Sequence, residues 1–98
     1  MTINKAMNGT ELTVSLAGRL DTSTAPQLEA ELKTNLSDLE SLILDLADLE
    51  YLSSAGLRVI LFAQKTMNKQ GKMIVKNANE TILDIFDMTG FSDILTLV

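Results

Sequence analysis

Apolar and polar side chains alternate over Glu11–Leu20, the most regular pattern in the first part of the chain. A period of two residues is typical of a strand that buries one face. The apolar positions are Leu12, Val14, Leu16 and Ala17. The stretch Ile3–Met7 predicts a weaker strand, and the Asn8-Gly9 pair after it favours a turn because both residues tolerate positive φ. We therefore expect an antiparallel hairpin at the start of the chain.

A helical period replaces the alternation after residue 24. Apolar side chains then recur at Ala25, Leu28, Leu32 and Leu36, with charged residues between them. Thr24 and Gln27 fit a capping box, and Pro26 is tolerated in the first turn of a helix. The pattern predicts an amphipathic helix of roughly three turns.

The middle of the chain predicts a strand, a loop and a long helix. Leu42–Leu46 is a short, mainly apolar run that we interpret as a central strand buried on both faces. We interpret Ala47–Leu52 as a loop leading to two serines. From Ala55 to Lys69 the apolar residues follow a helical period, and Gly71 is the expected stop for this helix.

The last third of the chain predicts a short strand and a third helix. Met73–Val75 is the strand, and Asn79 is suited to cap the helix that follows. This helix carries Ile82, Leu83, Ile85 and Phe86. Gly90 is expected to end it, with Phe91 placed for the hydrophobic contact that often follows such a cap. Ile94–Val98 is either a final strand or a helical turn.

The resulting order is β-β-α-β-α-β-α, with a possible terminal strand. Strands that alternate with helices indicate parallel pairs joined by right-handed crossovers. We therefore predict one α/β domain over residues 1–98: a small mixed sheet with an N-terminal hairpin, packed by three or four helices. Helices on one face of the sheet would suffice for a chain of 98 residues.

Composition excludes several kinds of chemistry. The chain has no His and no Cys, which rules out imidazole general bases, thiol catalysis and thiolate metal sites. The formal net charge of −5 disfavours binding to nucleic acid or anionic lipid. The carboxylates fit no calcium-loop spacing, so no metal and no cofactor is expected.

The chain shows no secretory signal at its N-terminus, and its longest apolar run is Val59–Ala63. A membrane span needs about 20 apolar residues. We therefore expect a cytoplasmic protein.

The two serines before the long helix are the most informative polar residues. Ser53 or Ser54 is suited to cap the helix, which is the simplest interpretation. A single cap needs only one hydroxyl, however, and Gly56 costs up to about 1 kcal/mol relative to alanine in a helix. Close approach by another backbone or by a partner would explain Gly56. A helix N-terminus also accommodates a phosphate, so phosphorylation of a serine stays open as the second interpretation.

Three segments together resemble the STAS domain of small bacterial anti-sigma factor antagonists. The first is Leu16–Asp21, which is similar to the strand end of that family. The second runs from Leu44 to Leu57 and is similar to its phosphorylation loop and following helix. The third is Ile85–Phe91, which is similar to its C-terminal helix end.

The resemblance implies a protein-binding switch and no enzymatic activity. In that family, an anti-sigma factor with serine kinase activity phosphorylates one serine of the antagonist, and a metal-dependent phosphatase restores the unmodified form. The unphosphorylated antagonist binds the anti-sigma factor and frees the sigma factor. The family's phosphoserine falls on Ser54, and its acidic strand-end residue falls on Asp21, near the same loop.

This chain departs from the commoner family pattern beside the acceptor. Ser53 stands where Asp is frequent and becomes a rival acceptor, and Ala55 stands where Ser or Thr is frequent. We expect Asp21, Ser53, Ala55 and Gly56 to support the acceptor site and partner binding. Asp21 also has a simpler interpretation as a cap for a turn or for the first helix. Arg58, four residues after Ser54, is interpreted as a solvated or partner-facing charge.

Other functions stay open at this level. The resemblance also fits a constitutive STAS adaptor, either a stressosome-like scaffold or a transporter subunit, in which Ser54 is only a cap. A binder of small molecules has only the anion-friendly helix start in its favour. A hydrolase would need a Lys or carboxylate base beside Ser54, and the sequence shows none nearby.

Overall fold

A four-stranded mixed sheet forms the body of the molecule in the computed structural model, which describes all residues from 1 to 98. The strands are β1 (Thr2–Asn8), β2 (Glu11–Leu20), β3 (Ser41–Leu52) and β4 (Lys72–Lys76), and they lie in that order across the sheet. β1 and β2 are antiparallel, whereas the β2–β3 and β3–β4 pairs are parallel. The predicted hairpin and mixed sheet are confirmed.

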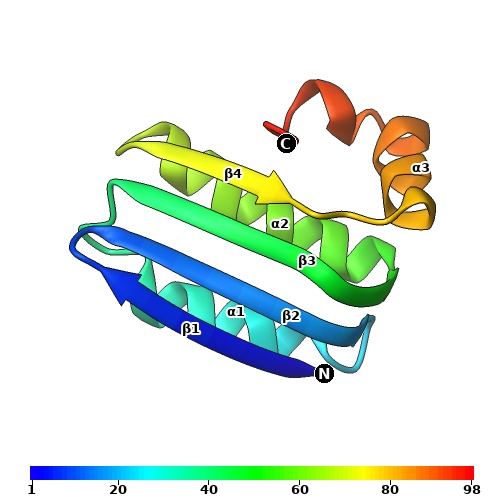
Figure 1. Cartoon of the computed structure of the whole chain (residues 1–98), viewed down its shortest axis with the longest axis horizontal. Coiled ribbons are helices and arrows are strands. Elements are labelled where there is room, and N and C mark those ends of the chain that lie inside the picture. Colours follow the sequence, from blue (N-terminus) through cyan, green and yellow to red (C-terminus); the bar gives the residue numbers. More distant parts are fainter.

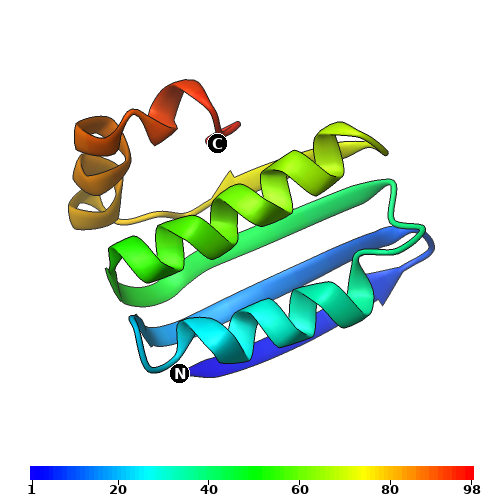
Figure 2. The same ribbon diagram turned by 180° about the vertical axis from the view of Figure 1, so that it is seen from behind.

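Two helices cover one face of this sheet. α1 (Ala25–Asn35) and α2 (Ser54–Asn68) lie side by side behind the strands in Figure 1 and in front of them in Figure 2. α3 (Glu80–Thr89) lies at the end of the sheet where β3 ends and α2 begins, and a short 3₁₀ helix, Phe91–Asp93, follows it. The single α/β domain with helices on one face agrees with the prediction.

Most of the core lies between the sheet and these two helices, and α3 adds Ile82 and Phe86 to it. Leu12, Val14 and Leu16 point inward from β2, as the alternation predicted. Opposite them, α1 buries Leu28 and Leu32. β1 has little share in this core, because only Ile3 of its seven residues is even half-buried.

The long strand β3 corrects two predictions. Residues 47–52 are not a loop, because β3 continues to Leu52 and pairs with β2 throughout. Two register shifts each add one residue to β3, so the buried positions Leu46, Leu49 and Leu52 are three residues apart. Because of this spacing, residues 47–52 lack the two-residue alternation that predicts a strand. The strand is also buried fully on one face only, since Ile43 stays half-buried on the face without helices.

Most predicted element ends lie within a few residues of the observed ones. The hairpin turn consists of Gly9 and Thr10, because Asn8 still pairs with Glu11. α2 ends at Asn68, three residues before Gly71. The lack of a side chain at Gly71 has a separate cause, since a Cβ there would lie 2.0 Å from the carbonyl oxygen of Glu40.

The third helix has the predicted caps. The Asn79 side chain accepts a hydrogen bond from the amide of Ile82 at 2.9 Å. Gly90 takes a left-handed conformation with φ of 81° at the other end. Phe91 then stacks on Phe86, with ring centroids 6.4 Å apart. The last residues form neither a full strand nor a helix, because only one bridge, between Val75 and Leu97, extends the sheet.

Candidate functional site

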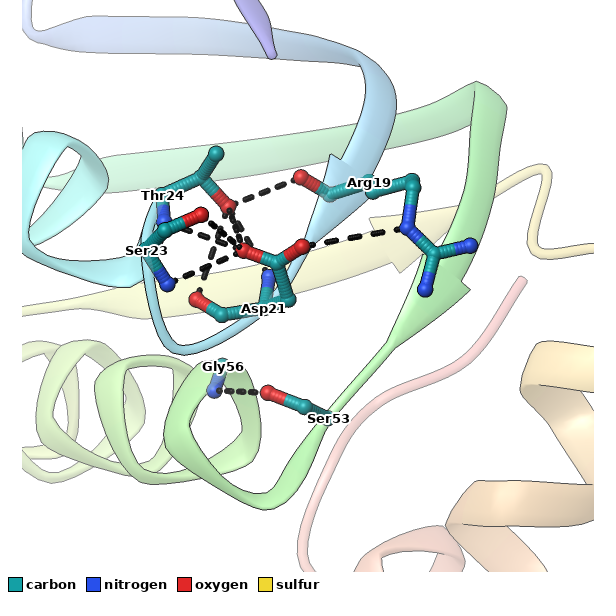
Figure 3. Close-up of polar contacts among 6 residues, drawn as sticks. All are labelled: Arg19, Asp21, Ser23, Thr24, Ser53 and Gly56. Atoms are coloured by element: carbon teal, nitrogen blue, oxygen red, sulfur yellow. Dashed lines mark hydrogen bonds and ion pairs between the residues drawn. The ribbon is translucent and has the colours of Figure 1, made fainter.

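The loops after β2 and after β3 meet at one end of the sheet. The two strands are parallel and Leu20 pairs with Leu52, so their carboxyl ends lie at the same edge. The amide of Ser53 donates to the carbonyl oxygen of Leu20 at 2.9 Å, which joins the two loops directly. Figure 3 shows Asp21, from the first loop, close to the start of α2.

The two serines at the start of α2 are in different environments. Ser53 is the N-cap, and its hydroxyl oxygen accepts a long hydrogen bond of 3.4 Å from the amide of Gly56. Ser54 is the first residue of the helix, and it is exposed. The Ser54 hydroxyl has no hydrogen-bond partner within the chain. The Ser53 hydroxyl already caps the helix. Ser54 is therefore the exposed serine of the pair, with its hydroxyl open to solvent.

Gly56 is required by the packing of α2 on the sheet. An added Cβ would lie 2.6 Å from Cγ of Leu20 and 2.8 Å from Cδ1 of Leu52. These distances are too short for any real contact, so a larger residue would push the start of α2 away from the strands. Neither a neighbouring backbone nor a partner has to be invoked, and Gly56 itself is buried. The lack of a side chain lets the start of α2 lie directly on Leu20 and Leu52.

Asp21 holds the loop between β2 and α1 in shape. One carboxylate oxygen, Oδ1, accepts hydrogen bonds from the amides of Ser23 and Thr24 at 3.0 and 3.1 Å, and from the Ser23 hydroxyl at 2.8 Å. The predicted capping box is wrong, because the Thr24 side chain caps no amide of α1. Its hydroxyl instead accepts from the amide of Asp21 and donates to the carbonyl of Arg19 (Figure 3).

These donors stabilise the ionised form of Asp21. The Ser23 hydroxyl has the largest effect, and with the amides of Thr24 and Ser23 it lowers the pKa of Asp21 below its ordinary value of 3.8, against a smaller opposing effect of desolvation. The observed contacts are those of the simpler interpretation of Asp21 as a turn cap. No hydrogen bond or ion pair joins the Asp21 carboxylate to Ser53 or Ser54.

The second carboxylate oxygen of Asp21 faces an arginine that the sequence did not single out. The Nε atom of Arg19 lies 3.7 Å from Oδ2 of Asp21. The same guanidinium stacks over the ring of Tyr51, with Cζ 4.2 Å from the ring centroid. Arg19 and Tyr51 are register partners on β2 and β3, so only the strand pairing could have revealed this contact. The pair adds a cation–π link between the two strands just before the site.

The remaining predicted site residue, Ala55, is half-buried against the core. Arg58 is exposed one turn after Ser54 and forms no ion pair. Asp45 lies in the middle of β3, opposite Ser15 of β2 and Lys76 of β4, and its carboxylate has a defined partner. The Asn77 amide donates to it at 3.0 Å, and this bond leads the interactions that lower the pKa of Asp45.

The structure contains no pocket and no group of three side chains that could hold a metal ion. None of its helices combines the length and the apolar character needed to cross a membrane.

Comparison with known proteins identifies the family. The family model of the STAS domain matches residues 2–98. The chain belongs to the STAS domain family. A putative anti-sigma factor antagonist of Bordetella bronchiseptica, BtrV, is 36% identical over 85% of this chain and 73% of its own length. The anti-sigma-B factor antagonist of Bacillus subtilis is 30% identical over 97% of this chain and 88% of its own length.

Solved structures of STAS proteins have the same fold. The unphosphorylated form of the anti-sigma factor antagonist SpoIIAA superposes with a TM-score of 0.79, at 18% identity, over 99% of this chain and 87% of that protein. The phosphorylated form of SpoIIAA, a Bacillus cell fate determinant, gives a TM-score of 0.78, at 19% identity, over 99% of this chain and 91% of that protein. The predicted family and fold class are confirmed.

Proposed function

We propose that this chain is an anti-sigma factor antagonist that is inactivated by phosphorylation of Ser54. The observation that carries the proposal is the difference between the two serines. Ser53 caps α2, while Ser54 is exposed and its hydroxyl forms no hydrogen bond within the chain. The names of the two relatives support the antagonist function. The unmodified chain binds an anti-sigma factor with serine kinase activity and thereby frees the sigma factor in the cytoplasm.

The switch works by charge and bulk. The kinase transfers the γ-phosphoryl group of ATP to Oγ of Ser54, and the hydroxyl proton passes to a base of the kinase. A metal-dependent phosphatase uses water to cleave the same bond and restores the hydroxyl. The antagonist is a substrate in both reactions and has no enzymatic role. The phosphate adds about 1.5 to 2 negative charges at the docking surface, and their repulsion and desolvation weaken the complex.

The start of α2 tolerates this modification without unfolding. The free amides of a helix N-terminus stabilise a nearby anion by about 0.3–1 kcal/mol at an exposed position. Ser53 is the poorer acceptor, since the residue is half-buried and its hydroxyl oxygen already accepts from the Gly56 amide. Phosphorylation of Ser53 would require the cap of α2 to break.

A phosphorylation and binding assay tests the proposal. The chain is incubated with its anti-sigma factor and ATP, the modified residue is mapped by mass spectrometry, and binding is measured by calorimetry. We expect the label on Ser54 and at least a tenfold weaker complex after phosphorylation, equivalent to about 1.4 kcal/mol. Ser54→Ala should bind and resist inactivation.

Ser53→Ala is the matched control, and it should still be phosphorylated. A label on any other residue would refute the assignment of Ser54. Equal affinity of the phosphorylated and unmodified chains would refute the switch and favour the alternative of a constitutive STAS adaptor.

A further inference from the structure

The negative charge of this chain is concentrated at its C-terminal end. Residues 77–98 contain four acidic residues and no Lys or Arg. Residues 1–76 contain nine acidic and eight basic residues, so they are almost neutral. Most of the net charge of −5 therefore lies on α3 and the short segment after it.

Three of these four acids lie along one face of α3. Glu80, Asp84 and Asp87 are spaced at three and four residues, which places them on a single side of a helix. The opposite side carries the buried residues Ile82 and Phe86, so the acidic side faces solvent.

Two large apolar side chains lie on the same outward face. Leu83 is 38% exposed and Met88 is 82% exposed, the highest value among the large apolar residues of the chain. Both continue the spacing of the acids. We call Glu80, Leu83, Asp84, Asp87 and Met88 the acidic stripe. A stripe that combines exposed apolar side chains with one sign of charge has the composition of a docking surface for an oppositely charged partner.

The acidic stripe lies at the same end of the molecule as Ser54. The side-chain amide of Asn79, at the start of α3, donates to the carbonyl oxygen of Leu49 near the end of β3 at 3.0 Å. Ser54 follows β3 directly. Figures 1 and 2 both place α3 beside the end of β3 and the start of α2. One partner can therefore contact both surfaces together.

We infer that the acidic stripe of α3 is a second docking surface for the anti-sigma factor, and that it fits a basic patch on that partner with an apolar hollow for Met88. This inference rests on the proposed function and adds the chemistry of the partner to it. The acids attract the basic patch and raise the association rate, while Met88 lengthens the lifetime of the complex. The stripe does not carry Ser54, so it contributes equally in both phosphorylation states.

The negative charge of the acidic stripe favours a basic protein as the partner that binds it. An anionic membrane would repel the three carboxylates of the stripe. A second copy of this chain would have to set its own acidic stripe against another acidic stripe in a symmetric dimer, which is also repulsive.

Association kinetics with the purified anti-sigma factor test the inference. Asp84→Lys changes an exposed residue that makes no side-chain hydrogen bond or ion pair. We expect an association rate about tenfold lower at low ionic strength and a weaker salt dependence. Met88→Ala should leave association unchanged and speed dissociation about fivefold. Asp84→Asn gives a smaller change in the same direction and serves if the reversed charge disturbs folding.

Glu40→Lys is the control for charge, because it makes the same change of charge just before the start of β3, at the opposite end of this strand; it also removes the hydrogen bond that Glu40 accepts from the Thr10 hydroxyl. It should bind at nearly the wild-type rate. If Asp84→Lys and Met88→Ala behave like Glu40→Lys while wild type binds well, the inference is overturned and the proposed function stands. If the wild-type chain does not bind the anti-sigma factor, both the proposed function and this inference are refuted. If sedimentation shows that the wild-type chain is a dimer and that Asp84→Lys is a monomer, the stripe serves self-association and the inference is overturned.

Discussion

At the scale of single residues, the site depends on which polar group occupies each hydrogen-bond position. Ser53 uses its oxygen to cap α2, and this leaves Ser54 exposed beside it. Asp21 uses Oδ1 to order the turn before α1 and turns Oδ2 toward Arg19. Of the two serines at the start of the helix, Ser54 is the one whose hydroxyl forms no hydrogen bond within the chain.

The lowered pKa of Asp21 predicts a stability that depends on pH. The folded state favours the ionised carboxylate, so its contribution is complete above the ordinary pKa of 3.8 and disappears as the pH falls through the lower pKa of the folded state. Asp21→Asn should therefore be less stable than wild type at neutral pH. The difference should shrink steadily as unfolding in urea is measured from neutral pH to about pH 3.

Ser23→Ala is the control for that experiment. It removes the hydroxyl that contributes most to the lowered pKa but leaves the carboxylate in place, so its profile should fall between those of wild type and Asp21→Asn. A difference between wild type and Asp21→Asn that stays constant over this pH range would contradict the argument.

At the scale of elements, β3 and α2 are fitted to each other at Leu52 and Gly56. The two register shifts in β3 bring Leu46, Leu49 and Leu52 onto the helix-covered face, although their spacing is not that of a regular strand. The start of α2 then lies against Leu52 and Leu20, where only glycine fits. The position of Ser54 is thus set by how closely this helix approaches the sheet.

Gly56→Ala should be destabilising even though alanine is the better helix former. The clash with Leu20 and Leu52 costs about 1–3 kcal/mol. The gain in helix propensity offsets up to about 1 kcal/mol of this. We expect a net loss of about 1–2 kcal/mol in the free energy of unfolding, measured in urea.

Two further variants isolate the clash as the cause. Ser54→Ala, in the same turn, should leave stability nearly unchanged because the residue is exposed. In a Leu20→Ala background, Gly56→Ala should lose part of its cost, since two of the three nearest atoms belong to Leu20 while Cδ1 of Leu52 remains. An equal cost in both backgrounds would show that the clash is not responsible.

At the scale of the whole molecule, the C-terminal residues close one edge of the sheet. The amide of Val75 donates to Thr96 at 2.9 Å, and the amide of Val98 donates to Val75 at 3.0 Å. These bonds occupy part of the outer edge of β4, which is otherwise open for pairing with another chain. The segment after α3 therefore protects the sheet as well as completing the fold.

Deletion of residues 96–98 should lower stability and promote self-association. The loss of two backbone hydrogen bonds, each contributing about 0.5–1.5 kcal/mol, predicts a Tm lower by roughly 5–10 °C. Light scattering should detect larger species at high concentration. Val98→Ser is the control, because it keeps the backbone bonds and changes an exposed side chain. A deletion variant that matches Val98→Ser in both measurements would contradict this role.

The order of elements, the hairpin, the caps of α3 and the single domain follow from the sequence alone. Each depends on residues close together in the chain, such as the alternation in β2 or the Asn79 and Gly90 caps. The family resemblance likewise rests on local motifs, and the family comparison confirms it. Local patterns determine these features because backbone geometry and side-chain period act over a few residues.

The tertiary structure decided everything that depends on contacts between distant segments. It extended β3 to Leu52 through pairing with β2, which no local period could show. It placed the Arg19 guanidinium over the Tyr51 ring. It also showed that Leu20 and Leu52 leave no room for a side chain at Gly56. It also distinguished the capping serine from the free one, because that depends on where the start of α2 meets the sheet. Apart from the contact between Gly56 and Leu52, these contacts join residues about 30 or more positions apart, and only the folded chain brings them together.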